Sequence, residues 1–201
     1  MSESKISTHI TSITNRAEPL LGSVAVGGGR GEDSKVWSWG DDNMLPYALS
    51  MMSRRSTTHR RIINDKADYI SGKGFTFASE VPLLGEFVAS VNGDGESLRQ
   101  ILNKLAFDKS LFGNAFLELV TDESHSFLSL YHQDASRCRL ARDQKHVILH
   151  HDWGSFRAEE SLSLPLYPTF EKQADGSLRS IVHYKEYEPM FTHYGVPKYI
   201  A

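Results

Sequence analysis

Residues 97–120, SLRQILNKLAFDKSLFGNAFLELV, change their hydrophobic period part-way along, and this change decides the fold. The first part places its apolar side chains on one side of a 3.6-residue helix: Leu98, Ile101, Leu102, Leu105 and Phe112. After Gly113-Asn114 the apolar side chains alternate, as they do in a strand. Because Ser97 is a typical N-cap residue and Gly113 tolerates a left-handed conformation, we predict a capped helix that turns at once into a strand.

Two further apolar residues, Phe107 and Leu111, lie four positions apart on the opposite side of this helix. The second half of the helix is therefore apolar on two sides. That pattern is typical of a helix buried between two layers of its own domain. The alternative is that this side meets another subunit, so we keep Phe107 and Leu111 as candidate subunit-contact residues.

The composition is that of an ordinary globular protein, with 201 residues, 40% of them hydrophobic and 23% charged. The net charge of −3 gives no electrostatic case for a free nucleic-acid-binding protein, whose footprint would be basic. The single cysteine, Cys138, excludes an internal disulfide framework and a cysteine-rich zinc site. Because the sequence shows neither a membrane-length apolar run nor a secretory signal, we expect a soluble protein made in the cytoplasm, with no membrane partner.

The chain divides into two parts by composition. Residues 1–34 are rich in Ser, Thr and Gly, and we predict a flexible N-terminal arm. The glycine run at 27–31 lacks the Lys-Ser/Thr of a phosphate-binding loop, so we expect no bound nucleotide or other cofactor. Residues 35–201 are predicted to form one α+β domain, helical over 44–112 and mainly β over 115–187.

Helix and strand signals follow one another along this domain. Further helices are expected at 44–53, 56–71 and 81–91, and a strand at 75–77. Asp41, Asp42 and Asn43 offer cap oxygens to the first of these helices. Trp37 and Trp39 would point the same way from a short strand and would bury a large area under any covering segment.

The second half predicts an antiparallel sheet with helices on one side, which is an α+β fold. Three hairpins are expected, pairing 115–121 with 126–131, 138–141 with 146–150, and 162–166 with 181–187. Charged or Gly-containing turns separate the paired segments, and Asp175-Gly176 would form the third turn.

Several residues invite a chemical interpretation. Arginines cluster where the second helix begins: Arg54, Arg55, Arg60 and Arg61. They are either a phosphate-contacting patch or a solvated helix face. Lys73, between two glycines, is either part of a ligand-binding loop or part of a helix stop.

His146 and His150 would share a strand face, but the sequence contains no zinc-binding signature such as HExxH. Cys138 has no partner at a spacing that marks a thiol enzyme, and no two acidic residues stand at a general acid–base spacing. We therefore expect no catalytic residue and no metal. The alternative is a small α+β ligand- or metal-binding domain, or a DNA-binding module that uses the arginines.

Three stretches occur in a fixed order along the chain: WSWGDDNMLPYALSMMSRRSTTHRRIINDKADYISGKGF at 37–75, LNKLAFDKSLFGNAFLELV at 102–120 followed by LSLYH, and EPMFTHYGVPKYIA at 188–201. In this order they resemble the N-terminal wing portion of tailed-bacteriophage portal proteins, the head–tail connectors. The first resembles the entry helices of that family. The second resembles its helix-to-strand passage, and the third resembles its "YG.P.Y" segment.

The resemblance implies a structural protein rather than an enzyme. Portal proteins form dodecameric ring homo-oligomers at one capsid vertex, through which double-stranded DNA is packaged and ejected. Their partners are terminase, capsid and scaffold proteins, and tail or adaptor proteins. The implied location is the virion of a phage or prophage, after assembly in the host cytoplasm.

Members of this family are longer than 201 residues. Their stem helices, clip and second half of the wing would follow Ala201. The resemblance therefore implies an incomplete wing at the C-terminus. The chain would be a fragment, a truncated product or a divergent protein that retains only the wing.

Overall fold

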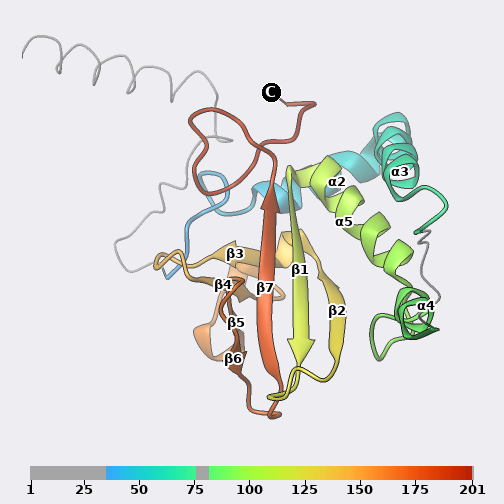
Figure 1. The fold of residues 1–201 in the computed structure, drawn as a ribbon. Helices are drawn as coiled ribbons and strands as arrows, with labels where there is room; N and C mark the ends of the chain where they lie inside the picture. Colours follow the sequence, from blue (N-terminus) through green and yellow to red (C-terminus); the bar gives the residue numbers. More distant parts are fainter. Residues whose placement is uncertain (1–34, 76–81, 201) are drawn as a thin grey trace, which may run out of the picture.

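The computed structural model describes residues 35–75 and 82–200 (Figure 1). The arm predicted at 1–34 and most of the strand predicted at 75–77 lie outside these residues. The described helices are α2 (Leu45–Arg55), α3 (Thr57–Ser71), α4 (Pro82–Ala89) and α5 (Leu98–Phe112). Within the described ranges, none of these helices is both long and apolar enough to span a membrane.

The helix-to-strand prediction at Ser97–Val120 is confirmed. The Ser97 hydroxyl accepts the Gln100 N–H, and the Gln100 side chain accepts the Ser97 N–H, which completes a capping box at the start of α5. Gly113 ends the helix in the left-handed region, with φ of 72°. The strand β1 (Asn114–Thr121) begins at the next residue.

The strands form two antiparallel sheets rather than the one that was expected, and the α+β class is confirmed. The remaining strands are β2 (Leu128–Gln133), β3 (Cys138–Leu140), β4 (His146–Leu149), β5 (Leu162–Pro165), β6 (Glu171–Lys172) and β7 (Leu178–Lys185). The four-stranded sheet has the order β2-β1-β7-β6, and the three-stranded sheet has the order β3-β4-β5. The first two predicted hairpins, β1–β2 and β3–β4, are both present.

The third predicted hairpin is wrong. β5 pairs with β4, and β7 pairs with β1 over eight residues, from Asn114↔Lys185 to Thr121↔Leu178. The Asp175-Gly176 turn joins β6 to β7 instead. Because β5 has only four residues, pairing β7 with the eight-residue β1 satisfies more backbone groups than pairing it with β5 would.

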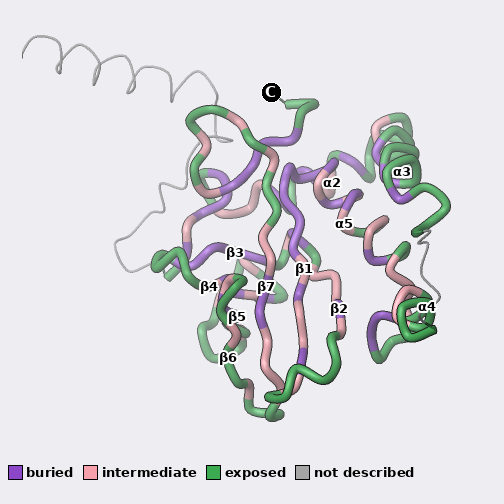
Figure 2. The backbone as a smooth tube through the Cα atoms, in the orientation of Figure 1, coloured by how far each residue is buried: buried purple, intermediate pink, exposed green. Residues whose placement is uncertain are grey.

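β1 lies between two cores because its side chains alternate between the two sheet faces. On one face Phe116 and Ile181 pack against Val147 of the second sheet. On the other face Leu119 packs in the cluster that contains Ile101 of α5. In Figure 2, buried residues lie along β1 and β7, and the outer sides of α3 and α4 are exposed.

His193 and Tyr194 of the C-terminal segment cover Trp37 and Trp39, and the sequence did not indicate which segment would do so. The predicted strand around them is a single bridge at Val36. His193 stacks on Trp37 with ring centroids 3.8 Å apart, and Tyr194 stacks on Trp39 at 4.4 Å. The C-terminal segment therefore closes over the start of the domain.

The prediction that Asp41, Asp42 and Asn43 provide the cap of α2 is also wrong. The N-cap residue is Met44, which provides no side-chain cap, and its N–H donates to the Asp42 carboxylate at 2.9 Å. Asn43 has a φ of 64°, and its side-chain oxygen accepts the Trp39 N–H at 3.0 Å and the Arg139 Nε–H at 2.5 Å. Arg139 is only 1% exposed, and burying its charge without hydrogen-bond partners would be costly. Asn43 provides one of the acceptors that its guanidinium needs.

Candidate functional site

The start of β1 and the C-terminal segment meet in what we call the Gly113–Gly195 junction. It comprises Gly113, Asn114, His183, Glu186 and residues 194–199. These residues come from the helix end, from two neighbouring strands and from the chain after β7. Two of the portal-like passages, the one around FGNAF and the one around YGVPKY, therefore contact each other across 81 positions of sequence.

The two glycines approach each other too closely for any side chain. A Cβ on Gly195 would lie 2.3 Å from the Gly113 carbonyl oxygen and 2.6 Å from the Glu186 nitrogen. A Cβ on Gly113 would lie 2.6 Å from the Val196 carbonyl carbon. Because the nearest atoms are backbone on both sides, no rotamer change can relieve the overlap.

Asn114 joins the two passages through all four of its hydrogen-bonding positions. Its side-chain NH2 donates to the carbonyls of Phe112 and Gly195, each at 2.9 Å. Its oxygen accepts the Gly195 N–H at 2.8 Å and the His183 Nε2–H at 3.0 Å. The side chain is fully buried, so each of these bonds replaces one to water.

His183 is held neutral in the junction. Burial of the ring, with a contribution from the charge of Lys185, lowers the pKa of His183 to about 3. The ring stacks on Phe116 with centroids 4.4 Å apart and an interplanar angle of 4°. A neutral ring that donates from Nε2 to Asn114 therefore belongs to a fixed polar network and is not poised to exchange protons near neutral pH.

Backbone bonds and ion pairs close the junction on its outer side. The Glu186 N–H donates to the Gly113 carbonyl at 2.7 Å, and the Tyr199 hydroxyl donates to the Leu111 carbonyl at 2.5 Å. The Glu186 carboxylate lies 2.9 Å from Lys109 Nζ and 3.0 Å from Lys198 Nζ. The hydrogen bond from Lys109, together with the charge of Lys198, lowers the pKa of Glu186.

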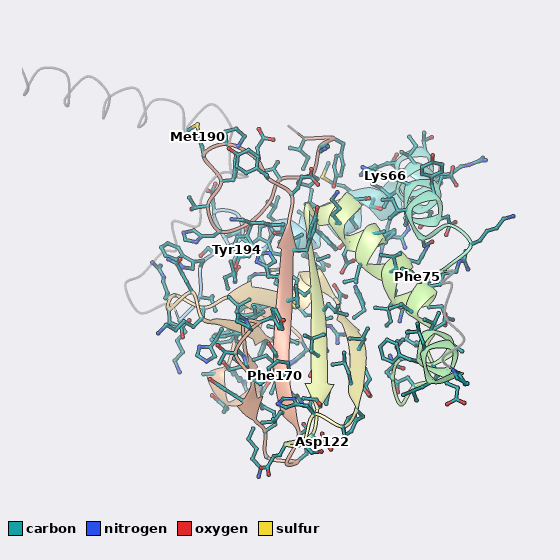
Figure 3. The ribbon with its side chains drawn as sticks, viewed as in Figure 1. Lys66, Phe75, Asp122, Phe170, Met190 and Tyr194 are labelled. Atoms are coloured by element: carbon teal, nitrogen blue, oxygen red, sulfur yellow. The ribbon has the colours of Figure 1, made fainter. Side chains whose placement is uncertain are left out.

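Tyr194, which is labelled in Figure 3, connects the Gly113–Gly195 junction to Trp37 and Trp39. Its hydroxyl donates to the Trp37 carbonyl at 2.8 Å and accepts the Leu140 N–H at 2.9 Å. Burial raises the pKa of this hydroxyl well above its ordinary value. The arrangement offers no activated nucleophile, and what it does physically is to hold four segments of the chain in one geometry.

The comparisons with known proteins find similarity in fold and none in sequence family. No protein-family model and no curated protein sequence matches this chain. A chain in the solved virion of a native gene transfer agent particle matches it with a TM-score of 0.55 and 16% identity, over 76% of this chain and 38% of that one. A chain in the neck of an empty gene transfer agent particle, computed with C6 symmetry, matches with a TM-score of 0.55 and 13% identity, over 76% and 39%.

This chain shares its fold with components of a gene transfer agent particle. At these identities the likeness concerns the fold alone. The match spans about two fifths of the length of each of those chains.

The four arginines are exposed on α2 and α3, and we call them together the α2–α3 basic surface. Arg54 and Arg55 end α2, and Arg60 and Arg61 lie in α3, all with exposed side chains. Arg61 Nε is 3.5 Å from Asp65, and the Arg60 guanidinium lies 4.4 Å from the centroid of the Phe107 ring. The surface is open to solvent, and its contact with nucleic acid stays a prediction.

Phe107 and Leu111 are used inside the domain. Leu111 is 1% exposed and belongs to the main core. Phe107 is partly buried against the same core under Arg60. Both side chains therefore contact their own domain, and their contact with another subunit stays a prediction.

The histidines singled out by the sequence have separate neighbours. His146 lies between Asp143, at 2.5 Å from Nδ1, and Glu171, at 3.1 Å from Nε2. Partial burial lowers the pKa of His146, but the hydrogen bonds to these two carboxylates outweigh it, so the pKa is raised. Both ring nitrogens of His146 thus face carboxylates of the same chain.

Among the described residues, the ligand atoms of His150, His151 and Glu160 come within 4.8 Å of one another. His150 is buried, and its Nδ1 accepts the Asp152 N–H at 3.1 Å. The Arg157 N–H points to Nε2 of the same ring at 3.4 Å. Each nitrogen of the His150 ring thus faces a backbone N–H group of the same chain.

Cys138 and Lys73 have simple structural settings. Cys138 is fully buried, its Sγ lies 3.4 Å from the Asp134 carbonyl, and burial raises the pKa of its thiol, so the reactive thiolate is disfavoured. Lys73 is exposed in the turn after α3, where Arg99 Nε donates to the Gly72 carbonyl at 2.8 Å. That bond fixes the turn as a helix stop.

Sequence reasoning missed Asp108, which is 5% exposed in the middle of α5. Its carboxylate accepts the Ala135 N–H at 2.9 Å and lies 2.8 Å from His132 Nε2. Burial raises its pKa, which these two bonds partly oppose. A signal existed, because Asp108 follows Ile101 by seven positions and therefore lies on the core-facing stripe of the helix.

Proposed function

We propose that this protein is a structural component of a portal ring in a tailed phage or a phage-derived particle. The observation that carries the proposal is the shared fold with chains from the virion and the neck of gene transfer agent particles. The portal-like sequence passages support it, because two of them meet in one buried junction. Neither line of support depends on composition, which is unremarkable for a globular protein.

The role that we propose is the wing of a ring homo-oligomer, a dodecamer in the complete protein, at one capsid vertex. Double-stranded DNA would pass through the ring during packaging and ejection. Terminase, capsid and scaffold proteins, and tail or adaptor proteins would dock on it. The protein would be part of the virion and would assemble in the host cytoplasm. The proposal assigns the chain no catalysis, cofactor or metal.

The Gly113–Gly195 junction suits such a role. A connector has to keep its peripheral domain in a fixed orientation relative to the chain that follows. Here Asn114, Glu186 and Tyr199 anchor the last described residues to the end of α5 and to both central strands. Fully satisfied buried polar groups select one geometry, because any shift would leave one of them unpaired.

Native mass spectrometry of the product of the complete reading frame tests the proposal. We expect a closed homo-oligomer with a narrow stoichiometry near twelve. A folded product that is monomeric at all concentrations would contradict the proposal. As a control, Gly85→Ala adds a methyl group where no atom lies within 4 Å and should leave the assembly unchanged.

A further inference from the structure

The helix α4 is apolar in sequence, and yet none of its residues is buried. Its sequence, PLLGEFVA, contains one charged residue, Glu86. A helix that is apolar on nearly all sides is normally covered by other parts of its protein. Here Leu83 is 72% exposed and Leu84 is 38% exposed, and Figure 2 shows most of the helix as exposed. This helix therefore carries apolar surface that is open to solvent.

The apolar surface of α4 continues onto the edge of the four-stranded sheet, beside which α4 lies (Figure 1). Together they form what we call the α4–β2 cleft, with a volume of about 700 Å³. Leu83, Leu84 and Phe87 line it from α4. Phe127 and Leu128, where β2 begins, line it from the sheet and are 50% and 44% exposed. Contiguous exposed apolar side chains of this kind mark interaction sites on soluble proteins.

The charge at the α4–β2 cleft is negative. Glu86 contributes a carboxylate to its lining. Asp122 lies at its rim, because its carboxylate accepts the N–H of Ser126, a lining residue, at 2.7 Å. Hydrogen bonds from the side chains of Ser126 and Ser124 lower the pKa of Asp122 to about 2, so this group is ionised at neutral pH. A partner with complementary chemistry would therefore present apolar side chains next to cations.

The edge of β2 leaves little room for a partner that adds as a strand. Leu130 already donates its N–H to the Val91 carbonyl at 2.8 Å, and its carbonyl accepts from the Asn92 side chain at 2.9 Å. Because edge groups face outward at every second residue of an antiparallel strand, Leu128 alone precedes Leu130 in β2 with its groups outward. One residue is too little for strand addition, whereas an amphipathic helix needs only an apolar groove.

We propose that the α4–β2 cleft binds an amphipathic helix of another protein, whose apolar row is flanked by lysines or arginines. The apolar row would cover Leu83 and Phe127, and the cations would face Glu86 and Asp122. This inference stands apart from the proposed ring, and its test does not require ring formation.

A second copy of this chain fits the cleft less well. The exposed face of α3 is basic, and its apolar residues Ile62 and Tyr69 are 58% and 89% exposed. They lie seven positions apart, however, and the positions between them on that face are the charged residues Asp65 and Lys66. This face of α3 therefore lacks the continuous apolar row that the cleft would bury.

Binding of synthetic helical peptides to the full chain, measured by fluorescence anisotropy, tests the proposal. The probe is a labelled peptide of about 18 residues with a leucine row flanked by lysines, and the matched probe has Glu in place of each Lys. The cleft variants are Leu83→Ser with Phe127→Ser, and Glu86→Gln, all at exposed positions. The control variants are Tyr187→Ser and Glu159→Gln, exposed residues that do not line the cleft. Circular dichroism verifies that each variant is folded.

We expect the basic probe to bind at least about ten times more tightly than the acidic probe. The double variant Leu83→Ser with Phe127→Ser should weaken its binding at least about tenfold, because both changes remove apolar area from the interface. Glu86→Gln should weaken it about threefold and reduce its dependence on salt. The two control variants should change the affinity by less than about twofold.

A basic probe that binds no better than the acidic one would overturn the proposal. Unchanged affinity in the cleft variants would also overturn it, since the probe would then bind elsewhere. Sedimentation velocity of the chain without probe examines the remaining occupant. Self-association that Leu83→Ser with Phe127→Ser removes would contradict the proposal, because a second copy would then fill the cleft.

Discussion

At the residue scale, the Gly113–Gly195 junction depends on two glycines and one asparagine, and no other residue type fits the two glycine positions. Gly113 needs a left-handed conformation, with φ of 72°, and it also needs the absence of a side chain next to Val196. Gly195 needs only the absence of a side chain, because the Gly113 carbonyl oxygen occupies the position that its Cβ would take. Asn114 then pairs the polar groups that this close approach buries.

Gly195→Ala is therefore expected to lower the free energy of unfolding by at least about 2 kcal/mol, because the new methyl group meets backbone atoms that cannot move aside. Urea denaturation of the purified chain measures this change. The control is Gly85→Ala in α4, where no atom lies within 4 Å and the helix should gain up to about 1 kcal/mol. Equal destabilisation by both changes would show that the junction is not tightly packed.

The low pKa of His183 predicts a loss of stability in acid. The folded pKa is about 3 and the ordinary value is 6.5, so between these values the unfolded chain binds a proton that the folded chain does not. For this group, the free energy of unfolding falls as pH decreases through that window, by about 1.4 kcal/mol for each pH unit. We expect His183→Gln to lack this component in denaturation curves at several pH values.

If the pH slopes of the wild type and His183→Gln were identical between pH 6.5 and pH 3, the buried neutral ring would be ruled out.

The role of Gly113 could be predicted from sequence, because a glycine at the end of a periodic helix has a local cause. The partners of Asn114 and His183 could not, because Gly195 lies 81 positions from Asn114 and nothing local indicates the contact.

At the element scale, α5 organises the domain because it contacts α3, β1 and β2 at once. Its periodicity predicted the helix and both caps, since those signals are local. The pairing of β7 with β1 was not predicted, because turn signals favour neighbours in sequence and say nothing of longer ladders. The division into two sheets was also not predicted, because it depends on tertiary contacts that turn signals do not indicate.

The capping box of α5 predicts a measurable contribution of Ser97. Replacing Ser97 with Ala removes the acceptor for the Gln100 N–H and should cost about 1 kcal/mol of unfolding free energy. Ser97→Asp keeps an acceptor oxygen and should stay within about 0.5 kcal/mol of the wild type. A loss of similar size in both variants, measured by thermal denaturation, would indicate that the cap is not formed.

The α2–α3 basic surface predicts weak, salt-dependent binding of duplex DNA. Each arginine that contacts a phosphate contributes about 0.9 to the slope of log affinity against log salt. Replacing the four arginines with Gln should therefore reduce that slope as well as the affinity. The control replaces the exposed Arg137 and Arg157, which lie outside this surface.

Fluorescence anisotropy with a short duplex over a range of salt concentrations gives both quantities. Slopes that do not differ between the four-arginine variant and the wild type would assign the arginines to a solvated helix face. The sequence could find this cluster, since the four residues lie within eight positions. It could not tell the two roles apart, because exposure alone is common to both.

At the scale of the whole molecule, three sequence passages follow one another in a fixed order along the chain. The chain also shares its fold with larger chains of gene transfer agent particles. Composition and charge predicted only a globular protein, and the helix and strand patterns predicted the α+β class. The passages added a specific expectation, and the structure shows that two of them touch at the Gly113–Gly195 junction. The fold comparison covers 76% of this chain and 38% of the first matched chain.

Electron microscopy of the complete reading-frame product tests that role most directly. The account predicts closed rings of about twelve copies, with this domain at the periphery and residues 113–116 in contact with residues 194–197 in every copy. It also predicts that Gly195→Ala reduces the yield of rings while Gly85→Ala does not. Well-folded particles that never close into rings, or rings in which this domain lines the central channel, would contradict the account.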